Sequence, residues 1–232
     1  MIIRLTARDG FRIDAWRAEP ALSPHGGLVV VHENAGLTDH IRDVADGFAA
    51  EGYLAIAPAF FDRLQRNLVF AYGESQIEAR RETRSRMDLD KTLLDVGAAV
   101  GEASTAGKVG IVGYCWGGSV AWLAAARLPE LSCAVSYYGS AIAGLVGERP
   151  LCPVMMHWGT EDHTLPLARA KEIAAAHPGA VSHFYEGAGH SFNNPFERYV
   201  EGAARLARER TLEFLRAHLG YKPAGIKGAV LL

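Results

Sequence analysis

Short, uninterrupted runs of apolar residues constrain the fold of this chain more than any other feature. They lie at residues 28–31, 54–57 and 109–112. A strand with one solvent-exposed face alternates polar and apolar residues, whereas a continuous apolar run is typical of a strand that is buried on both faces. Segments with helical periodicity separate these runs, as in HIRDVADGFAAEGY, which ends near a capping Gly52. Strands that alternate with helices predict an α/β fold, with a mainly parallel central sheet and helices on both faces.

The remaining elements are predicted from similar patterns. Residues 2–7 and 11–18 flank Asp9-Gly10 and predict a hairpin. Further strands are expected in CAVSYYG, CPVMMHWG and VSHFYEG, and helices before residue 103, from Gly117, at 168–176 and in ARLARERTLEFLRAHL. The charged segment 62–90 is interpreted as a solvated helix face. We expect one α/β domain over residues 1–220 and leave the tail 221–232 unassigned.

Composition narrows the classes of partner. The formal net charge is −2, which gives no long-range attraction to nucleic acid or to anionic lipid. No apolar stretch approaches the roughly 20 residues of a membrane helix, and no signal peptide is recognised. Three widely spaced cysteines form neither a disulfide framework nor a C-x-x-C pair. We therefore expect a cytoplasmic monomer or small homo-oligomer that binds a small molecule, with no membrane or nucleic-acid partner.

The stretch GKVGIVGYCWGGSVAWLAAA places a cysteine at a sharp bend. Gly113-Tyr114-Cys115-Trp116-Gly117 fits the strand–turn–helix nucleophile elbow, with Cys in place of the usual Ser. Glycines on either side let the strand and the helix approach, and the turn exposes the nucleophile. The N-terminus of the following helix favours negative charge and so favours a thiolate. Cys115 is the predicted nucleophile.

An elbow nucleophile needs a base and an acid that orients it, in the chain order nucleophile, acid, base. HWGTEDHTLP follows a predicted strand and offers Asp162, with Glu161 and His163 as competitors. YEGAGHSF follows the last predicted strand and offers His190. In parallel sheets the carboxyl ends of strands share one edge, where reactive groups gather. We therefore expect a Cys115–His190–Asp162 triad.

Acyl transfer also requires donors for the developing oxyanion. The backbone N–H of Trp116 follows the nucleophile, and a second N–H is expected from Asn34 in the loop HENAG. These features predict acyl transfer through a thioester on Cys115, with no metal or organic cofactor. The other cysteines, Cys133 and Cys152, are interpreted as small apolar residues in or beside strands.

These motifs together resemble the dienelactone hydrolases, a branch of the α/β-hydrolases with a Cys-His-Asp triad and a G-x-C-x-G-G elbow. The matching residues are G-Y-C-W-G-G, D-H after the strand that precedes the acid, and A-G-H-S-F around the histidine. The resemblance runs from about residue 10 to residue 215. The resemblance implies a hydrolase of small lactones or esters. It also implies a further glutamate at Glu33, which holds the resting thiol until substrate binding releases a thiolate. A carboxylate there would hinder the oxyanion unless it moved or became neutral.

The resemblance also implies arginines that bind a substrate carboxylate, and here the sequence departs from the family. The arginine expected four residues after the histidine is replaced by Asn194, which predicts weaker recognition of an acidic lactone. A second arginine is expected among Arg80, Arg81 and Arg84, with Arg81 taken as the representative. Ser191 and Tyr137 complete the expected substrate contacts.

Two other classes remain as alternatives. Glutamine amidotransferases also carry an elbow cysteine, but they place an acid two residues after the histidine, where this chain has Phe192. A non-catalytic small-molecule binding protein on the same scaffold is the second alternative. Such a protein would be expected to lose a triad member, and none is lost here.

Overall fold

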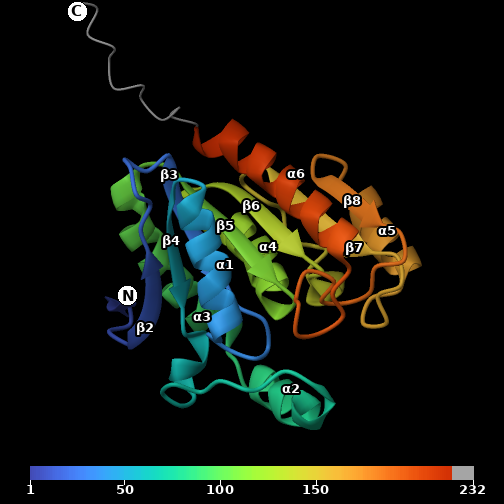
Figure 1. Ribbon diagram of the computed structural model, residues 1–232, viewed down its shortest axis with the longest axis horizontal. Coiled ribbons are helices and arrows are strands. Elements are labelled where there is room, and N and C mark those ends of the chain that lie inside the picture. Colours follow the sequence, from blue (N-terminus) through green and yellow to red (C-terminus); the bar gives the residue numbers. More distant parts are fainter. Residues whose placement is uncertain (221–232) are drawn as a thin grey trace, which may run out of the picture.

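A mixed sheet of eight strands forms the centre of the molecule (Figure 1), in a computed structural model that describes residues 1–220. The strand order is β1-β2-β4-β3-β5-β6-β7-β8. The pairs β1–β2 and β2–β4 are antiparallel, and all other neighbouring pairs are parallel. The strands are β1 (Ile2–Thr6), β2 (Arg12–Ala18), β3 (Gly26–Val31), β4 (Tyr53–Pro58), β5 (Val109–Tyr114), β6 (Leu131–Tyr137), β7 (Val154–Gly159) and β8 (Val181–Tyr185).

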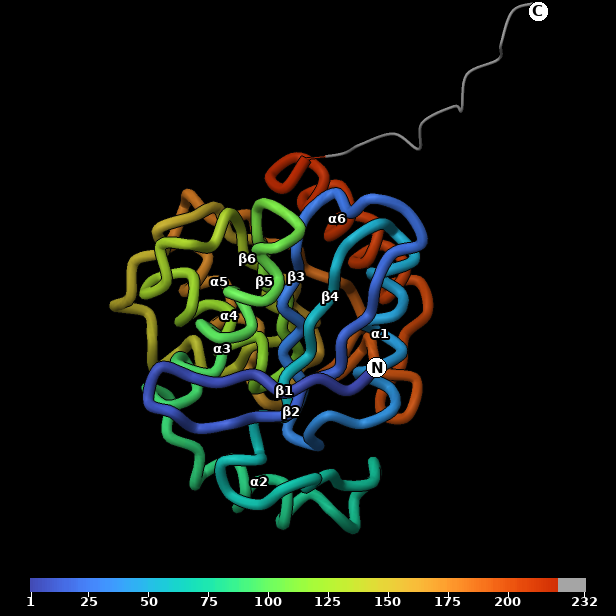
Figure 2. Tube along the Cα trace, turned by 90° about the vertical axis from the view of Figure 1, so that its left-hand side faces the viewer, coloured from blue at the N-terminus to red at the C-terminus, as the bar shows by residue number. Residues whose placement is uncertain are grey.

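Helices cover both faces of this sheet, which Figure 2 shows from the side. The α-helices are α1 (Asp39–Ala50), α2 (Ile77–Ser85), α3 (Leu89–Ala103), α4 (Trp116–Arg127), α5 (Leu167–Ala176) and α6 (Glu201–Leu219). Helices α1 and α6 lie on one face, and α3, α4 and α5 lie on the other. The predicted α/β-hydrolase architecture is confirmed. The tail from residue 221 onward lies outside the described residues.

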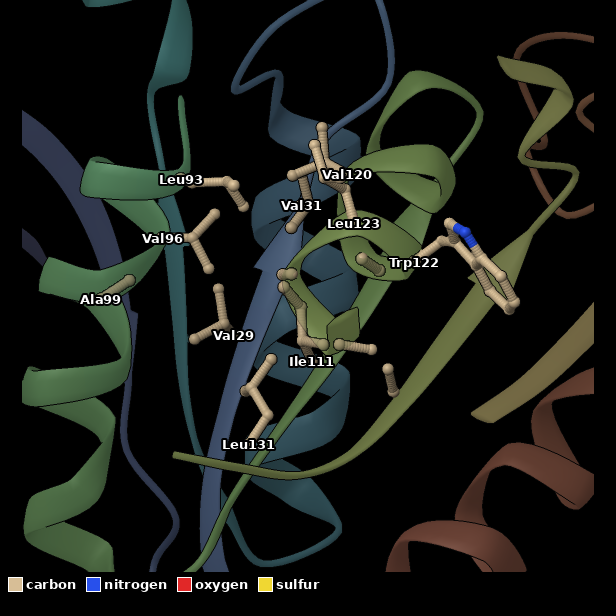
Figure 3. Close-up of a cluster of buried hydrophobic side chains, with 14 of the residues drawn as sticks. Val29, Val31, Leu93, Val96, Ala99, Ile111, Val120, Trp122, Leu123 and Leu131 are labelled. Atoms are coloured by element: carbon tan, nitrogen blue, oxygen red, sulfur yellow. The ribbon is translucent and has the colours of Figure 1, made fainter. Parts of the chain in front are cut away.

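Continuous apolar runs become strands buried on both faces. Every residue of β3, β4 and β5 is buried, as their lack of alternation predicted. Val29 and Ile111 pack with α3 and α4 in the core that Figure 3 shows, whereas Leu28 and Val112 face α1 and α6. Each such side chain contributes about 1.5–3 kcal/mol by leaving water. The sheet is therefore a rigid support for the loops at its edge.

Local signals set the helix boundaries. Helix α1 begins at Thr38, whose hydroxyl accepts a hydrogen bond from the backbone N–H of Ile41. It ends before Gly52, which has φ of +93° as predicted for a C-terminal glycine. Asp88 caps α3 by accepting from the N–H groups of Asp90 and Lys91. Short 3-10 helices lie between these elements, at Phe60–Arg63, Glu74–Gln76, Ser104–Ala106 and Ser140–Gly144.

The charged segment 62–90 departs from the expected solvated helix face. Its helix α2 lies apart from the sheet, beyond one end of the strands, in both views (Figures 1 and 2). Arg80 and Thr83 are buried although the surrounding sequence is dense in charge. Within residues 1–220, no helix combines the length and the apolar character that crossing a membrane requires.

Candidate active site

Cys115 lies at a strained turn between β5 and α4. Its φ of +54° and ψ of −116° lie outside the regions that side chains other than glycine prefer. A Cβ atom on Gly113 would come closer than 3.0 Å to the carbonyl oxygen of Gly117, and one on Gly117 would meet the carbonyl oxygen of Val31. The glycines predicted for an elbow are therefore required by backbone contact. The turn leaves the thiol half-buried at the carboxyl end of β5.

Three side chains from three strand ends meet here. The Nε2 atom of His190 lies 3.1 Å from the Sγ atom of Cys115. The Nδ1 atom of the same ring lies 2.8 Å from the Oδ2 atom of Asp162. Asp162 follows β7 and His190 follows β8, so neighbouring parallel strands place both at the same edge as Cys115. This is the order and geometry of a nucleophile, a base and an orienting acid.

Asp162 is held in place by its own loop. Its Oδ1 atom accepts hydrogen bonds from the backbone N–H groups of Thr164 and Leu165, at 2.7 and 3.2 Å. Burial opposes ionisation, but the hydrogen bond from His190 and these backbone donors hold the pKa of Asp162 below its usual range. The competitor Glu161 is exposed and its side chain makes no contact with His190. Asp162 is thus the carboxylate that orients the imidazole.

The histidine is set up to carry a proton. Burial alone would lower the pKa of His190, but the sulfur of Cys115 and the carboxylate of Asp162 together raise it to about 10. A charged imidazolium is stabilised most when the sulfur beside it is a thiolate. The imidazole ring therefore lies where it can exchange a proton with the sulfur atom of Cys115.

Two backbone N–H groups, those of Trp116 and Asn34, are the candidates for an oxyanion site. Trp116 is the first residue of α4, so its N–H has no acceptor within the helix. The loop after β3 runs beside this helix end, because Gly117 packs against the backbone of Val31 and His32. Asn34 lies in that loop and lines the same cavity as Cys115. The Nδ1 atom of His32 lies 2.6 Å from the carbonyl oxygen of Glu33, which helps to fix the loop.

Glu33 is buried, lines the same cavity as Cys115 and makes no hydrogen bond to it. Its Oε1 atom accepts a hydrogen bond of 3.2 Å from the hydroxyl of Tyr138. Its Oε2 atom accepts one of 2.7 Å from the side-chain amide of Asn194. Burial raises the pKa of Glu33, and the hydrogen bonds from Asn194 and Tyr138 oppose this only in part. In this structure Cys115 is paired with His190, and the carboxyl of Glu33 is turned to other partners.

A cavity of about 410 Å³ opens over the triad. Its walls come from α2 and its approach, from the loops after β3, β6 and β7, and from the loop after β8. The charged residues of its lining are Glu33, Glu74, Arg80, Arg81, Arg84, Glu197 and Arg198. A second cavity, of about 400 Å³, lies at the other end of β5 beside Lys108 and contains no triad residue. Among residues 1–220, no group of three or more His, Cys, Asp or Glu side chains is arranged to hold a metal ion.

The candidate arginines of α2 have different environments. Arg80 is buried and donates to Glu197 at 2.7 Å and to the carbonyl oxygen of Gly73 at 3.1 Å. Its guanidinium therefore forms bonds within the cavity wall. Arg81 is exposed and pairs with Glu78. The guanidinium of Arg84 makes no hydrogen bond or ion pair with any described residue. Of the three, Arg84 is the one with unused donors at the cavity.

Of the other two expected substrate contacts, Ser191 and Tyr137, only Ser191 lies at the cavity. Ser191 lines the cavity, at a backbone φ of +61°. Tyr137 does not line it: this side chain is buried under α6, where its hydroxyl lies 2.7 Å from the Oγ1 atom of Thr211. The expectation that Tyr137 contacts substrate is therefore corrected, because its hydroxyl is already paired within the core.

Tyr138, Arg198 and the pairing of Asn194 are three further features of the site. Tyr138 has a φ of +41°, and its ring centroid lies 5.2 Å from that of His190. Arg198 lines the cavity from the loop after β8 and has no partner among the described residues. Asn194 is fully buried and is absent from the cavity lining. Of these three features, only the presence of a cation at Arg198, eight residues after His190, could have been noticed in the sequence.

Known proteins resemble this chain over nearly its whole length. Residues 13–219 match the model of the dienelactone hydrolase family. Carboxymethylenebutenolidases of Pseudomonas putida and Pseudomonas knackmussii are each 32% identical over 235 residues, which cover 95% of this chain and 98% of theirs.

Solved structures agree with this assignment. The "Putative Dienelactone Hydrolase" of Klebsiella pneumoniae subsp. pneumoniae superposes with a TM-score of 0.78 at 28% identity, over 94% of this chain and 98% of that one. A dienelactone hydrolase-like promiscuous phosphotriesterase from metagenomic libraries shares the fold, with a TM-score of 0.74 at 20% identity over 94% and 98% of the two chains. The predicted resemblance is confirmed, and the chain belongs to the dienelactone hydrolase family.

Proposed function

We propose that this protein hydrolyses small lactones or esters through a thioester formed on Cys115. One observation carries the proposal: the Nε2 atom of His190 lies 3.1 Å from Cys115 Sγ while its Nδ1 atom lies 2.8 Å from Asp162. A thiol joined to an oriented imidazole at a strained elbow is the arrangement that nucleophilic catalysis requires. The similarity to carboxymethylenebutenolidases supports a carboxylic ester or lactone as the substrate.

The first half of the reaction forms the thioester. The thiolate of Cys115 attacks the carbonyl carbon, and the carbonyl π electrons move to oxygen, where the N–H groups of Trp116 and Asn34 are placed to stabilise the oxyanion. When the tetrahedral intermediate collapses, the C–O bond to the leaving group breaks. His190 gives its Nε2 proton to the departing oxygen, so that an alcohol or enol is released.

The second half removes the acyl group. His190, now neutral, takes a proton from a water molecule, and the hydroxide attacks the thioester carbonyl. Collapse of this second intermediate breaks the C–S bond, releases the carboxylic acid and restores the thiolate–imidazolium pair. Asp162 keeps the imidazole in the tautomer that presents Nε2 to the sulfur and stabilises its charge in both halves.

Glu33 is proposed to gate the nucleophile. Its carboxyl lines the cavity next to an oxyanion donor, where a fixed negative charge would oppose the transition state. Burial raises the pKa of this carboxyl, and hydrogen bonds from Tyr138 and Asn194 hold it in place. Because Glu33 is turned away from Cys115 in this arrangement, gating requires the carboxyl to move back toward the thiol when no ester is present.

The cavity favours substrates that carry an anionic group. Arg84 on α2 and Arg198 after β8 line it from two sides, and their guanidinium donors are unused by the described residues. A guanidinium binds a carboxylate through two parallel hydrogen bonds. We propose that this pair, with Ser191 and with Arg81 nearby, takes over the recognition that the family arginine absent at Asn194 would provide. A cytoplasmic setting, which keeps thiols reduced, is part of the proposal.

The test measures turnover and the covalent intermediate together. Purified protein is given p-nitrophenyl acetate or dienelactone, with Cys115→Ala as the control, and acid-quenched samples are weighed by intact-protein mass spectrometry. We expect turnover of at least one substrate and an added acyl mass on the wild-type chain, both absent from Cys115→Ala. Turnover that persists in the variant would refute the thioester. Binding of both substrates without turnover would instead support the non-catalytic alternative.

A further inference from the structure

Asn194 is buried deeply although it belongs to a loop rich in polar residues. Its exposed fraction is 0%, and it stands four residues after His190 in the loop that follows β8. Its Nδ2 atom donates to Glu33 Oε2 at 2.7 Å, across 161 residues of chain. The side chain is therefore committed to Glu33 and does not face the cavity.

The orientation of this amide is fixed by a second bond. The Oδ1 atom of Asn194 accepts the backbone N–H of Phe196 at 2.9 Å. The backbone N–H of Asn194 donates to the carbonyl oxygen of Ser191, also at 2.9 Å, which closes the turn. Because Oδ1 already has a donor, rotation of the amide would place two oxygens together at Glu33 and leave the Phe196 N–H without its acceptor. Asn194 thus presents an N–H group to Glu33.

Both side chains that bond to Glu33 are neutral. Tyr138 donates a hydroxyl from the opposite side, at 3.2 Å. Two other titratable groups interact with the carboxyl electrostatically without bonding to it. His190 favours its ionised form, and Glu197, which is paired with Arg80, disfavours that form. The other titratable groups that face this region are Cys115, Tyr72 and Tyr114. No direct cationic partner offsets the burial of Glu33, which raises its pKa.

We propose that Asn194 is a positioning residue which holds Glu33 turned away from Cys115 and, as a neutral donor, sets the pH at which Glu33 ionises. This inference rests on the proposed gating role of Glu33 and deepens it. An arginine at this position would hold the carboxyl as a fixed anion. Asparagine instead stabilises the ionised carboxyl less than a cation would, while its bond to the turn keeps the carboxyl in one place.

The experiment measures the ionisation of Glu33 directly. Infrared spectra of the wild-type protein and of Glu33→Gln are recorded across pH, and the difference isolates the C=O band of the neutral Glu33 carboxyl. The same titration is made for Asn194→Leu, which removes the donor at similar volume, and for Tyr138→Phe, which removes the other donor and keeps the ring. Tyr185→Phe is the matched control, since it deletes a buried hydroxyl that bonds to His157 at 2.7 Å and not to Glu33.

Loss of a donor to a carboxylate destabilises the charged form. We therefore expect the titration midpoint of Glu33 to rise by about one pH unit or more in Asn194→Leu and in Tyr138→Phe. The pH profile of kcat/KM should move in the same direction, and Tyr185→Phe should leave the midpoint in place. A residue with a purely structural role would change the amount of folded protein without moving this midpoint.

Two results would overturn the inference. One is an unmoved midpoint in folded Asn194→Leu and Tyr138→Phe, and the other is a wild-type Glu33 that titrates at the ordinary value for glutamate. Failure of the proposed function has a different signature, because an absent thioester on Cys115 leaves the infrared titration unchanged. If Asn194→Leu does not fold, Asn194→Ala, which removes the same donor with less bulk, takes its place and decides between the outcomes.

Discussion

Gly113 and Gly117 approach each other so closely that no side chain fits between them. A Cβ atom on Gly113 would meet the Gly117 carbonyl oxygen at less than 3.0 Å, with backbone on both sides of the contact. We predict that Gly113→Ala lowers the free energy of unfolding by on the order of 3 kcal/mol, because strand and helix must separate. Urea denaturation measures this change.

The control lies on α3. Gly101 is exposed and has no atom within 4 Å of a Cβ position, so Gly101→Ala should stabilise the chain by about 0.5–1 kcal/mol through helix propensity. Equal effects of the two substitutions would contradict the close approach at the elbow.

Replacement of the nucleophile should separate folding from activity. Cys115→Ala removes the attacking atom, and we expect kcat for an activated ester to fall by on the order of 10³-fold or more. Stability should change little, since the thiol is half-buried at the cavity. Matched loss of a distant thiol, in Cys152→Ala, should leave kcat unchanged in a steady-state assay.

Asp162 should act on the histidine and not on substrate binding. Asp162→Asn removes the charge opposite His190 and alters the tautomer, so kcat should fall by about 10²–10⁴-fold while KM stays nearly constant. Glu161→Gln provides the control, because the neighbouring carboxylate is exposed. A loss of activity in Glu161→Gln that equals the loss in Asp162→Asn would mean that the orienting acid has been misassigned.

The alkaline limb of the pH profile should report His190. Its pKa is raised to about 10 in the folded protein, so the imidazolium that protonates the leaving group persists below that pH and is lost as pH rises through it. We expect kcat/KM, corrected for the rate with Cys115→Ala, to decline near pH 10. A decline already centred near the ordinary histidine value of about 6.5 would show that the thiolate–imidazolium pair does not form.

The unpaired arginines should discriminate substrates by charge. Arg198→Gln or Arg84→Gln removes a guanidinium from the cavity, and we expect KM for a carboxylate-bearing ester to rise about tenfold, equivalent to about 1.4 kcal/mol. KM for a neutral ester of similar size should stay constant. Arg205→Gln, on α6 and paired with Glu209, is the control for loss of a surface charge. Equal changes for both esters would exclude a role in recognising charge.

The elbow and the parallel sheet could be predicted because their signals are local. Residues 109–117 carry strand, glycine and helix signals in one stretch, and β5 and α4 begin and end close to where that stretch indicates. The positions of Asp162 and His190 follow from the rule that parallel strands end at one edge. A linear pattern is sufficient when the constraint lies within a few residues or follows from sheet topology.

Contacts across the chain could not be predicted in this way. Tyr137 and Tyr138 are adjacent and chemically alike, and strand alternation would place them on opposite faces. The positive φ of Tyr138 breaks that alternation, so both rings pack in one cluster, with centroids 6.1 Å apart. Asn194 was expected to matter only as a missing arginine, because nothing in the sequence indicates that it bonds to Glu33.

The ion pair between Arg80 and Glu197 gives the cavity a particular adaptability. Helix α2 contributes no member of the triad, yet this partly buried ion pair at 2.7 Å fastens it to the loop that carries His190. The other residues of α2 can therefore be substituted to suit different substrates, provided that the ion pair between Arg80 and Glu197 is kept. Selection for new specificities in this scaffold would be expected to vary α2 around an Arg80 that stays unchanged, since its loss would disturb the catalytic loop from the outside.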